Sequence, residues 1–128
     1  MTDTNASEIV CAFLGEWPNG AAALRQSFRD YLADDVDYEN VGLTHSRGQS
    51  EALALIDNFM PGLDRIDVDM LAIAQDGDKV LTERIDHLRT ADGTLLASLR
   101  VMGIFEIRGG RIARWRDYFD TLPFATSS

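Results

Sequence analysis

The sequence is poor in the residue types that most often hold disulfides or metals. Its 128 residues include one cysteine, Cys11, and two histidines, His45 and His87. A single thiol cannot close an internal disulfide, which fits a reducing compartment, so we expect a cytoplasmic protein. Two isolated histidines and one cysteine are too few for a metal site, so we expect no bound metal.

Long apolar runs and clusters of positive charge are also absent. No segment approaches the ~18 apolar residues of a membrane span, and the first residues, MTDTN, lack the basic start and apolar run of a signal peptide. The net charge of −9 disfavours nucleic acids and anionic substrates. No glycine-rich phosphate loop or dinucleotide fingerprint occurs. We therefore expect no membrane span, no nucleic-acid partner and no cofactor.

The residues that are present have the composition of a globular domain. Hydrophobic residues make up 45% and charged residues 26% of the chain, with only 3 prolines and 10 glycines. A chain of this length can bury a core and a modest cavity. We expect residues 1–128 to form a single domain.

Helical periodicity is confined to the first half of the chain. Apolar residues recur on one face over residues 5–17, with Asn5 as the N-cap, and again over residues 21–32. A third helix is predicted to begin at residues 47–49 and to end at Met60, because the residue before a proline avoids the helical region.

Alternation of apolar and polar residues predicts strands in the rest of the chain. The predicted strands are residues 36–43, 66–75, 80–88, 95–107 and 112–119. Glycine-containing turns between the last four indicate an antiparallel meander. The sequence thus predicts an α+β fold, in which a curved mixed, largely antiparallel sheet wraps around the N-terminal helices and forms a cone-shaped barrel with an internal pocket.

One predicted strand places opposite charges on an apolar face. Alternation over residues 80–88 puts Arg84 and Asp86 on the same side as Val80 and Leu88. A buried ion pair contributes little net stability, because desolvation of both charges offsets their attraction, and such pairs are often retained for chemistry or specificity. The alternative is a cross-strand pair on the surface.

Two further strands have polar groups on their apolar faces. Tyr38 and Asn40 are predicted to point inward from one, and Asp117 stands between Trp115 and Phe119 on the other. Two carboxylates in one pocket, one protonated and one ionised, can supply an acid and a base together. The alternatives are a solvated edge position for Asp117 and ordinary core and turn positions for Tyr38 and Asn40.

Three motifs in this order resemble the limonene-1,2-epoxide hydrolase family. They are Tyr38-Glu39-Asn40, Thr82-Glu83-Arg84-Ile85-Asp86 and Trp115-Arg116-Asp117-Tyr118-Phe119-Asp120. The resemblance spans roughly residues 28–122. It implies the cone-shaped α+β barrel shared with nuclear transport factor 2 and ketosteroid isomerase. It also implies addition of water to an apolar epoxide, giving a vicinal diol without metal or cofactor.

The resemblance implies a role for each polar residue. Asp117 would be the general base and would take a proton from a water molecule held by Tyr38 and Asn40. Asp86, protonated, would donate to the epoxide oxygen. Arg84 would lie between the two carboxylates and keep Asp117 ionised. The apolar wall of the substrate pocket is expected to include Leu88, Leu99, Val101, Phe119 and Met70.

The resemblance also implies a homodimer formed through the outer surface of the sheet, where Leu71, Ile73 and Ile104 are expected to be exposed. Two other functions remain open for the same fold. One is a ketosteroid-isomerase-like or polyketide-cyclase-like enzyme, in which an aspartate removes a proton next to a carbonyl group. The other is a non-catalytic module that binds a small ligand.

Overall fold

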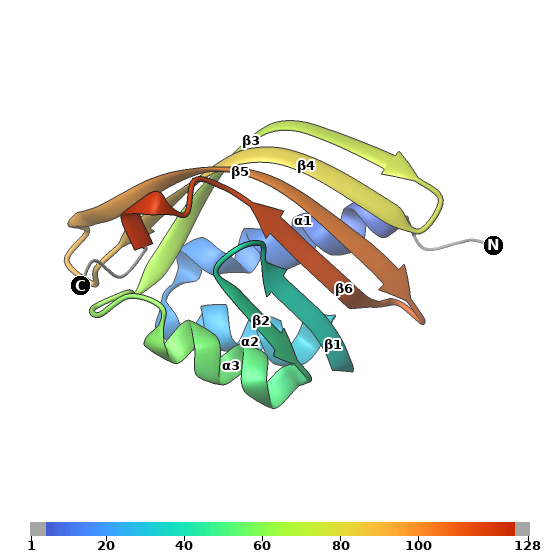
Figure 1. Cartoon of the computed structure of the whole chain (residues 1–128), viewed down its shortest axis with the longest axis horizontal. Helices are drawn as coiled ribbons and strands as arrows, with labels where there is room; N and C mark the ends of the chain where they lie inside the picture. Colours follow the sequence, from blue (N-terminus) through green and yellow to red (C-terminus); the bar gives the residue numbers. More distant parts are fainter. Residues whose placement is uncertain (1–4, 125–128) are drawn as a thin grey trace.

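A curved six-stranded sheet covers three α-helices in the computed structural model, which describes residues 5–124 (Figure 1). The helices are α1 (Ala6–Glu16), α2 (Ala21–Tyr31) and α3 (Gln49–Asn58), and a short 3₁₀ helix, η1 (Trp17–Asn19), connects the first two. Residues 1–4, on which the expectation about a signal peptide rests, lie outside the described residues.

The predicted helices are confirmed to within a few residues at their ends. Asn5 is the N-cap of α1, since its side chain accepts a hydrogen bond from the backbone N–H of Ser7. Gly20, with φ of 112°, separates η1 from α2, because this backbone conformation is open mainly to glycine. None of the helices within residues 5–124 is long and apolar enough to cross a lipid bilayer.

The four predicted strands of the meander are also confirmed. They are β3 (Arg65–Asp76), β4 (Lys79–Arg89), β5 (Leu95–Arg108) and β6 (Arg111–Tyr118), each antiparallel to the next. The order in the sheet is β2-β1-β6-β5-β4-β3, and β1 runs parallel to β6, so the sheet is mixed as expected. The sheet has free edges at β2 and β3, so the cone is open rather than closed into a barrel.

The first strand differs from its prediction. It begins earlier, as β1 (Leu32–Asn40), because Leu32 and Ala33 are buried against the core. A turn with Gly42 at φ of 86° then leads into a strand that the sequence did not predict, β2 (Thr44–Arg47). This edge strand is short and polar, and it lacks the apolar alternation that would reveal it.

A β-bulge interrupts the alternation of β3. Met70 pairs with Arg84 and Ala72 pairs with Glu83, which leaves Leu71 as the extra residue. Beyond the bulge Ile73 pairs with Thr82, and directly opposed residues share a face. Leu71 and Ile73 are exposed as expected, but the bulge returns Ile73 to the inner side of the sheet, so its expected place on the outer surface is wrong. Ile104 lies opposite Leu81 on the outer side, but it is half-buried and not exposed.

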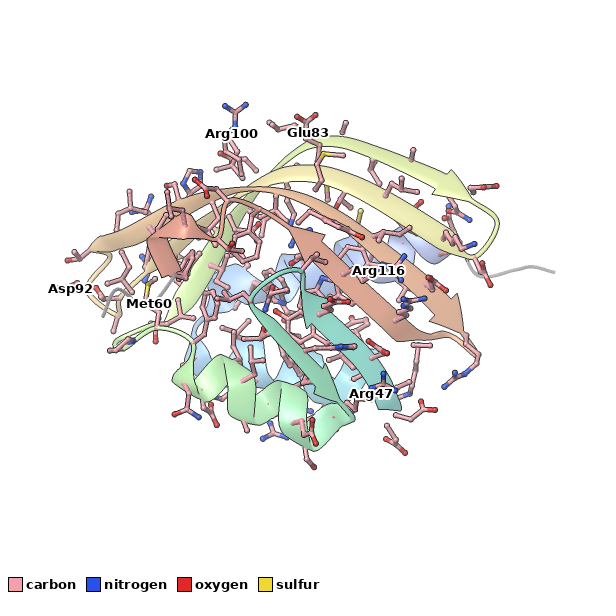
Figure 2. The ribbon with its side chains drawn as sticks, viewed as in Figure 1. Arg47, Met60, Glu83, Asp92, Arg100 and Arg116 are labelled. Carbon is pink, nitrogen blue, oxygen red and sulfur yellow. The ribbon has the colours of Figure 1, made fainter. Side chains whose placement is uncertain are left out.

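Side chains fill the space between the helices and the sheet (Figure 2), and an aromatic cluster lies in this core. Phe13 of α1 is fully buried, and its ring contacts those of Trp17, Phe28 and Trp115 at centroid distances of 5.2 to 5.7 Å. Trp115 in turn stacks on Tyr38 at 3.9 Å. The core thus fixes two residues, Trp115 and Tyr38, that also form the wall of the polar site.

Candidate active site

Alternation in β4 turns a row of five residues toward the core. Every second residue from Val80 to Leu88 is buried, and Arg84 has an exposed fraction of 0%. Few charged side chains are buried this completely without partners. The surface-pair alternative for Arg84 and Asp86 is therefore excluded.

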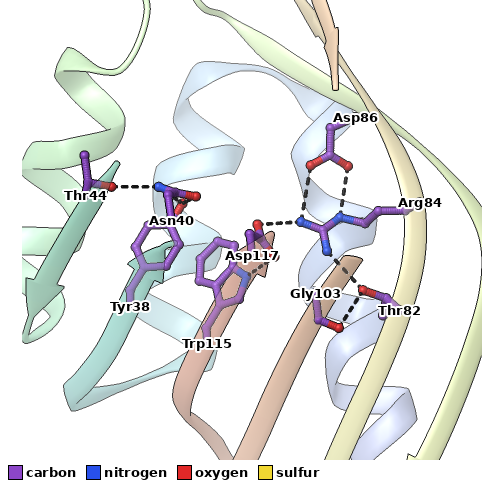
Figure 3. Close-up of polar contacts among 9 residues, drawn as sticks. All are labelled: Tyr38, Asn40, Thr44, Thr82, Arg84, Asp86, Gly103, Trp115 and Asp117. Atoms are coloured by element: carbon purple, nitrogen blue, oxygen red, sulfur yellow. Dashed lines mark hydrogen bonds and ion pairs between the residues drawn. The ribbon is translucent and has the colours of Figure 1, made fainter. Parts of the chain in front are cut away.

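The Arg84 guanidinium joins three side chains from two strands (Figure 3). Nε donates to Asp86 Oδ1 at 3.0 Å and Nη2 donates to Asp86 Oδ2 at 3.3 Å. Nη2 also donates to Asp117 Oδ2 at 2.7 Å, while Nη1 donates to Thr82 Oγ1 at 3.0 Å. The planar, forked guanidinium is suited to this bridging, which a lysine could not reproduce.

Asp117 is held from two sides at the centre of the sheet. Its Oδ2 accepts from Arg84, and its Oδ1 accepts from the indole Nε1 of Trp115 at 2.9 Å. Since β6 lies between β1 and β5, Asp117 is not at a sheet edge, and its exposed fraction is only 5%. The solvated-edge alternative for Asp117 is therefore wrong.

Tyr38 and Asn40 reach the site because β1 is parallel to β6. In this register Asn40 lies beside Asp117 and Tyr38 beside Trp115. Asn40 Nδ2 donates to Thr44 Oγ1 at 2.9 Å and to Tyr38 Oη at 3.2 Å. The structure thus brings all five predicted polar residues to one side of the sheet.

Burial changes the acid–base behaviour of these groups. It raises the pKa of Asp86 to about 6; Arg84 opposes this shift and the charge of Asp117 adds to it. Burial alone would lower the pKa of Arg84, but Asp117 and Asp86 outweigh it and the net shift is upward, so the guanidinium stays charged. Burial also raises the pKa of Tyr38, whose hydroxyl therefore remains neutral. With Arg84 charged, a single proton on the two carboxyl groups makes the buried cluster electrically neutral.

The two carboxyl groups, Tyr38 and Asn40 line a cavity of about 40 Å³. A buried water requires about 10–15 Å³, so the cavity has room for water beside the carboxyl groups. The rest of its wall is apolar or aromatic. Four of the residues predicted for an apolar wall line it: Leu88, Leu99, Val101 and Phe119.

Met70 does not line this cavity, contrary to expectation. It lies in a separate surface depression with Cys11 and Leu14, because this part of β3 packs against α1. The alternation in this strand correctly predicts that Met70 points toward the helices. It does not predict that α1 covers this end of the sheet.

Sequence reasoning assigned no role to several polar contacts of the site. Thr82 accepts a hydrogen bond from Arg84, and Trp115 donates one to Asp117. In each pair the charged residue lies two positions further along the same strand. The spacing of two residues on an inward face could have revealed both. Trp17 lines the cavity, and its buried Nε1 has no hydrogen-bond partner among residues 5–124.

Comparison with solved structures first defines the class of the fold. The structure superimposes on a SnoaL-like protein of Jannaschia sp. CCS1 with a TM-score of 0.76 over 97% of this chain and 94% of the other, at 15% identity. An NTF2-like protein of Cytophaga hutchinsonii gives a TM-score of 0.70 over 96% of both chains, also at 15% identity. The chain therefore has the cone-shaped NTF2-like fold.

Sequence comparison then defines the family within this class. The model of the limonene-1,2-epoxide hydrolase catalytic domain matches residues 4–126, and this chain belongs to that family. A structure of an LEH-like epoxide hydrolase from Mycobacterium tuberculosis is 35% identical, with a TM-score of 0.75 over 91% of this chain and 83% of that one. The resemblance inferred from the three motifs is confirmed.

A curated relative carries a functional name. Epoxide hydrolase EphG of Mycobacterium tuberculosis is 44% identical over 89 residues, which cover 70% of this chain. The matched region spans 58% of the length of EphG.

The raised pKa of Asp86 predicts a specific pH dependence of stability. A carboxyl group that binds its proton more tightly when folded stabilises the protein fully below its unfolded pKa of about 4, and this stabilisation is lost as the pH rises through 6. We expect the unfolding free energy of the wild type, relative to that of Asp86→Asn, to fall by up to about 3 kcal/mol between pH 4 and 7. Urea unfolding at a series of pH values measures this difference. A difference that stays constant with pH would contradict the assignment.

Proposed function

We propose that this protein is an epoxide hydrolase that adds water to a neutral, apolar epoxide in one step and releases a vicinal diol. The observation that carries this proposal is the buried Arg84, which is hydrogen-bonded to both Asp86 and Asp117, the two carboxyl groups that line one cavity. Membership of the family and the name of EphG support it. We assign the activity to residues 1–128 acting as one catalytic domain.

The base in this scheme is Asp117. Its carboxylate accepts a proton from a water molecule that Tyr38 and Asn40 orient, and the water oxygen forms a bond to one carbon of the epoxide ring. Two fixed donors, Arg84 and Trp115, hold Asp117 in a single orientation. Preorganisation of this kind lowers the barrier because the group need not reorient during the reaction.

The acid is Asp86. As the carbon–oxygen bond of the ring breaks, its electron pair moves to the epoxide oxygen, which takes the proton of Asp86. The pKa of about 6 supports this role, because a carboxyl group with an ordinary pKa would be almost fully ionised near neutrality. Each turnover leaves one proton on Asp117 and removes one from Asp86, and exchange with solvent restores the starting state.

The cavity favours a small apolar substrate. Its volume of about 40 Å³ is less than an epoxide of several carbons requires, so such a substrate needs side chains at the wall to move. Phe59 and Phe119 line the cavity, and Phe124 packs on both at centroid distances of 5.3 and 5.8 Å. Phe59 and Phe124 also line an open depression of about 510 Å³, which offers room for this movement.

Replacement of the base gives the direct test. We expect Asp117→Asn to lower turnover of a reactive epoxide such as cyclohexene oxide by at least about 100-fold, since general base catalysis contributes about 10²–10⁴-fold. The fold should persist, because an asparagine keeps the shape of the side chain. The measurement is chiral chromatography of the diol formed from a panel of cyclic and linear epoxides, together with circular dichroism of the variant.

Asp120→Asn is the matched control, because Asp120 is exposed three residues along the chain, and this variant should keep full activity. Undiminished activity of Asp117→Asn would refute the assignment of the base. A single turnover in H₂¹⁸O distinguishes a covalent route, since only that route labels an enzyme carboxylate. Turnover of an enolisable ketone with none of any epoxide would favour the isomerase alternative.

The pKa of Asp86 predicts the pH profile of activity. Because the acid must carry its proton, we expect kcat/KM to fall above pH 6, approaching about tenfold per pH unit. Initial rates of diol formation between pH 4 and 9, corrected for spontaneous hydrolysis, measure the profile. Asp35→Asn should reproduce the wild-type curve, since Asp35 is exposed and pairs with Arg108 on the surface. A flat profile between pH 6 and 8 would exclude Asp86 as the acid.

We further propose a cytoplasmic homodimer that associates through the outer face of the sheet. Leu71, Leu81 and Met102 are 40–52% exposed on this face. Glu83 and Arg100 project from the same face, and neither forms an ion pair within residues 5–124 (Figure 2). A two-fold axis would bring the apolar residues of two copies together and place Arg100 near Glu83 of the second copy.

Light scattering after size-exclusion chromatography tests the dimer. The wild type should elute with twice the mass of the chain, and Met102→Arg should give the monomer, because it places like charges opposite each other across the axis. Leu122→Arg is the control, since Leu122 is 76% exposed and belongs to the short 3₁₀ helix that follows β6, outside the sheet. A monomeric wild type at micromolar concentration would refute the proposal.

A further inference from the structure

Gly103 of β5 lies directly under the Arg84 guanidinium (Figure 3). It pairs with Thr82 of β4 on one side and with Asp117 of β6 on the other. A Cβ atom at residue 103 would lie 2.5 Å from Arg84 Nη1, 2.5 Å from Asp117 Oδ1 and 3.1 Å from Thr82 Oγ1. The first two distances are far shorter than any van der Waals contact, so no side chain fits there while the bridge is intact.

The backbone conformation does not explain a glycine at this position. Eight of the ten glycines have positive φ, where other residues are strained, but Gly103 does not. It stands in the interior of a 14-residue strand, where glycine weakens the structure. Space for a neighbouring group is the remaining reason for a glycine here, and the three atoms nearest to an added Cβ all belong to the polar cluster.

The contacts around Gly103 tie it to both ends of the bridge. Its carbonyl oxygen accepts from Thr82 Oγ1 at 3.3 Å, and the same Thr82 oxygen accepts from Arg84 Nη1. Asp117 cannot withdraw freely from an added Cβ, because its Oδ1 is held by Trp115. The guanidinium is rigid and is held at its other edge by Asp86, so any accommodation must loosen the contact between Arg84 and Asp117.

We propose that Gly103 is a positioning residue of the site, whose missing side chain allows one arginine to bind both carboxyl groups at once. It acts through Arg84 and Asp117 and touches no reacting atom. The expected effect of Gly103 on catalysis rests on the proposed epoxide hydrolysis. Its effect on the contacts of Arg84 with the two carboxyl groups rests on the geometry alone.

The test compares Gly103→Ala with Gly15→Ala in the full chain. Gly15 is the matched control, because it also has no positive φ and a Cβ there would meet nothing within 4 Å. We expect Gly103→Ala to lower kcat about 100-fold, as small misplacements of catalytic groups do. KM should change little, since the apolar wall is untouched. The fall in activity above pH 6 should move to higher pH, because a displaced Arg84 stabilises the ionised carboxyl groups less.

A purely structural role would give a different result. In that case Gly103→Ala would lower the unfolding midpoint but leave kcat per folded molecule and the pH profile unchanged, and this outcome would overturn the proposal. Gly15→Ala should match the wild type in kcat and in the pH profile, and its unfolding midpoint should not fall, because alanine is a better helix former than glycine within α1.

A double-mutant cycle of unfolding free energies tests the proposal without a measurement of enzyme activity. Lysine lacks the Nη1 atom that an added Cβ would meet, so Gly103→Ala should destabilise the Arg84→Lys variant less than the wild type in urea unfolding. Equal destabilisation in both backgrounds would overturn the proposal. If Gly103→Ala alone does not fold, a folded double variant supports the proposal and an unfolded one refutes it. Should the wild type hydrolyse no epoxide, the proposed function fails while this cycle still decides the role of Gly103.

Discussion

The interaction on which the structure depends is the charged Arg84 guanidinium held between Asp86 and Asp117 in the core. Removing these charges from water is costly, and their attraction offsets that cost only when every donor has a partner. All three nitrogen atoms of Arg84 have partners, and four of its five N–H groups form hydrogen bonds to three side chains. The bridge therefore constrains the inward residues of three adjacent strands, down to the missing side chain of Gly103.

The aromatic core and the polar site are parts of one arrangement. Trp115 stacks on Tyr38 and donates its N–H to Asp117, so the residue that packs against the helices also orients a carboxylate. The parallel pairing of β1 with β6 adds Asn40 to the same side of the cavity. A fold shared with proteins only 15% identical provides the cone, and the polar groups inside it determine the chemistry.

Much of this could be predicted from the chain alone. Period-two alternation put Arg84, Asp86 and Asp117 on the same faces as apolar residues, and the three ordered motifs indicated the family. The prediction failed where local pattern carries no signal. The polar edge strand β2 exists because it pairs with β1, the bulge at Leu71 reversed the side on which Ile73 lies, and packing of α1 kept Met70 away from the cavity.

The sequence by itself therefore determined which residues share a face along each uninterrupted segment of strand, because side-chain direction follows from backbone geometry within one segment. Only the tertiary structure decided which of these residues meet. Contacts such as those of Gly103 with Arg84 and Asp117, or of Trp115 with Tyr38, depend on strand register and sheet curvature. These arise from hydrogen bonding and packing between segments that lie far apart in the chain.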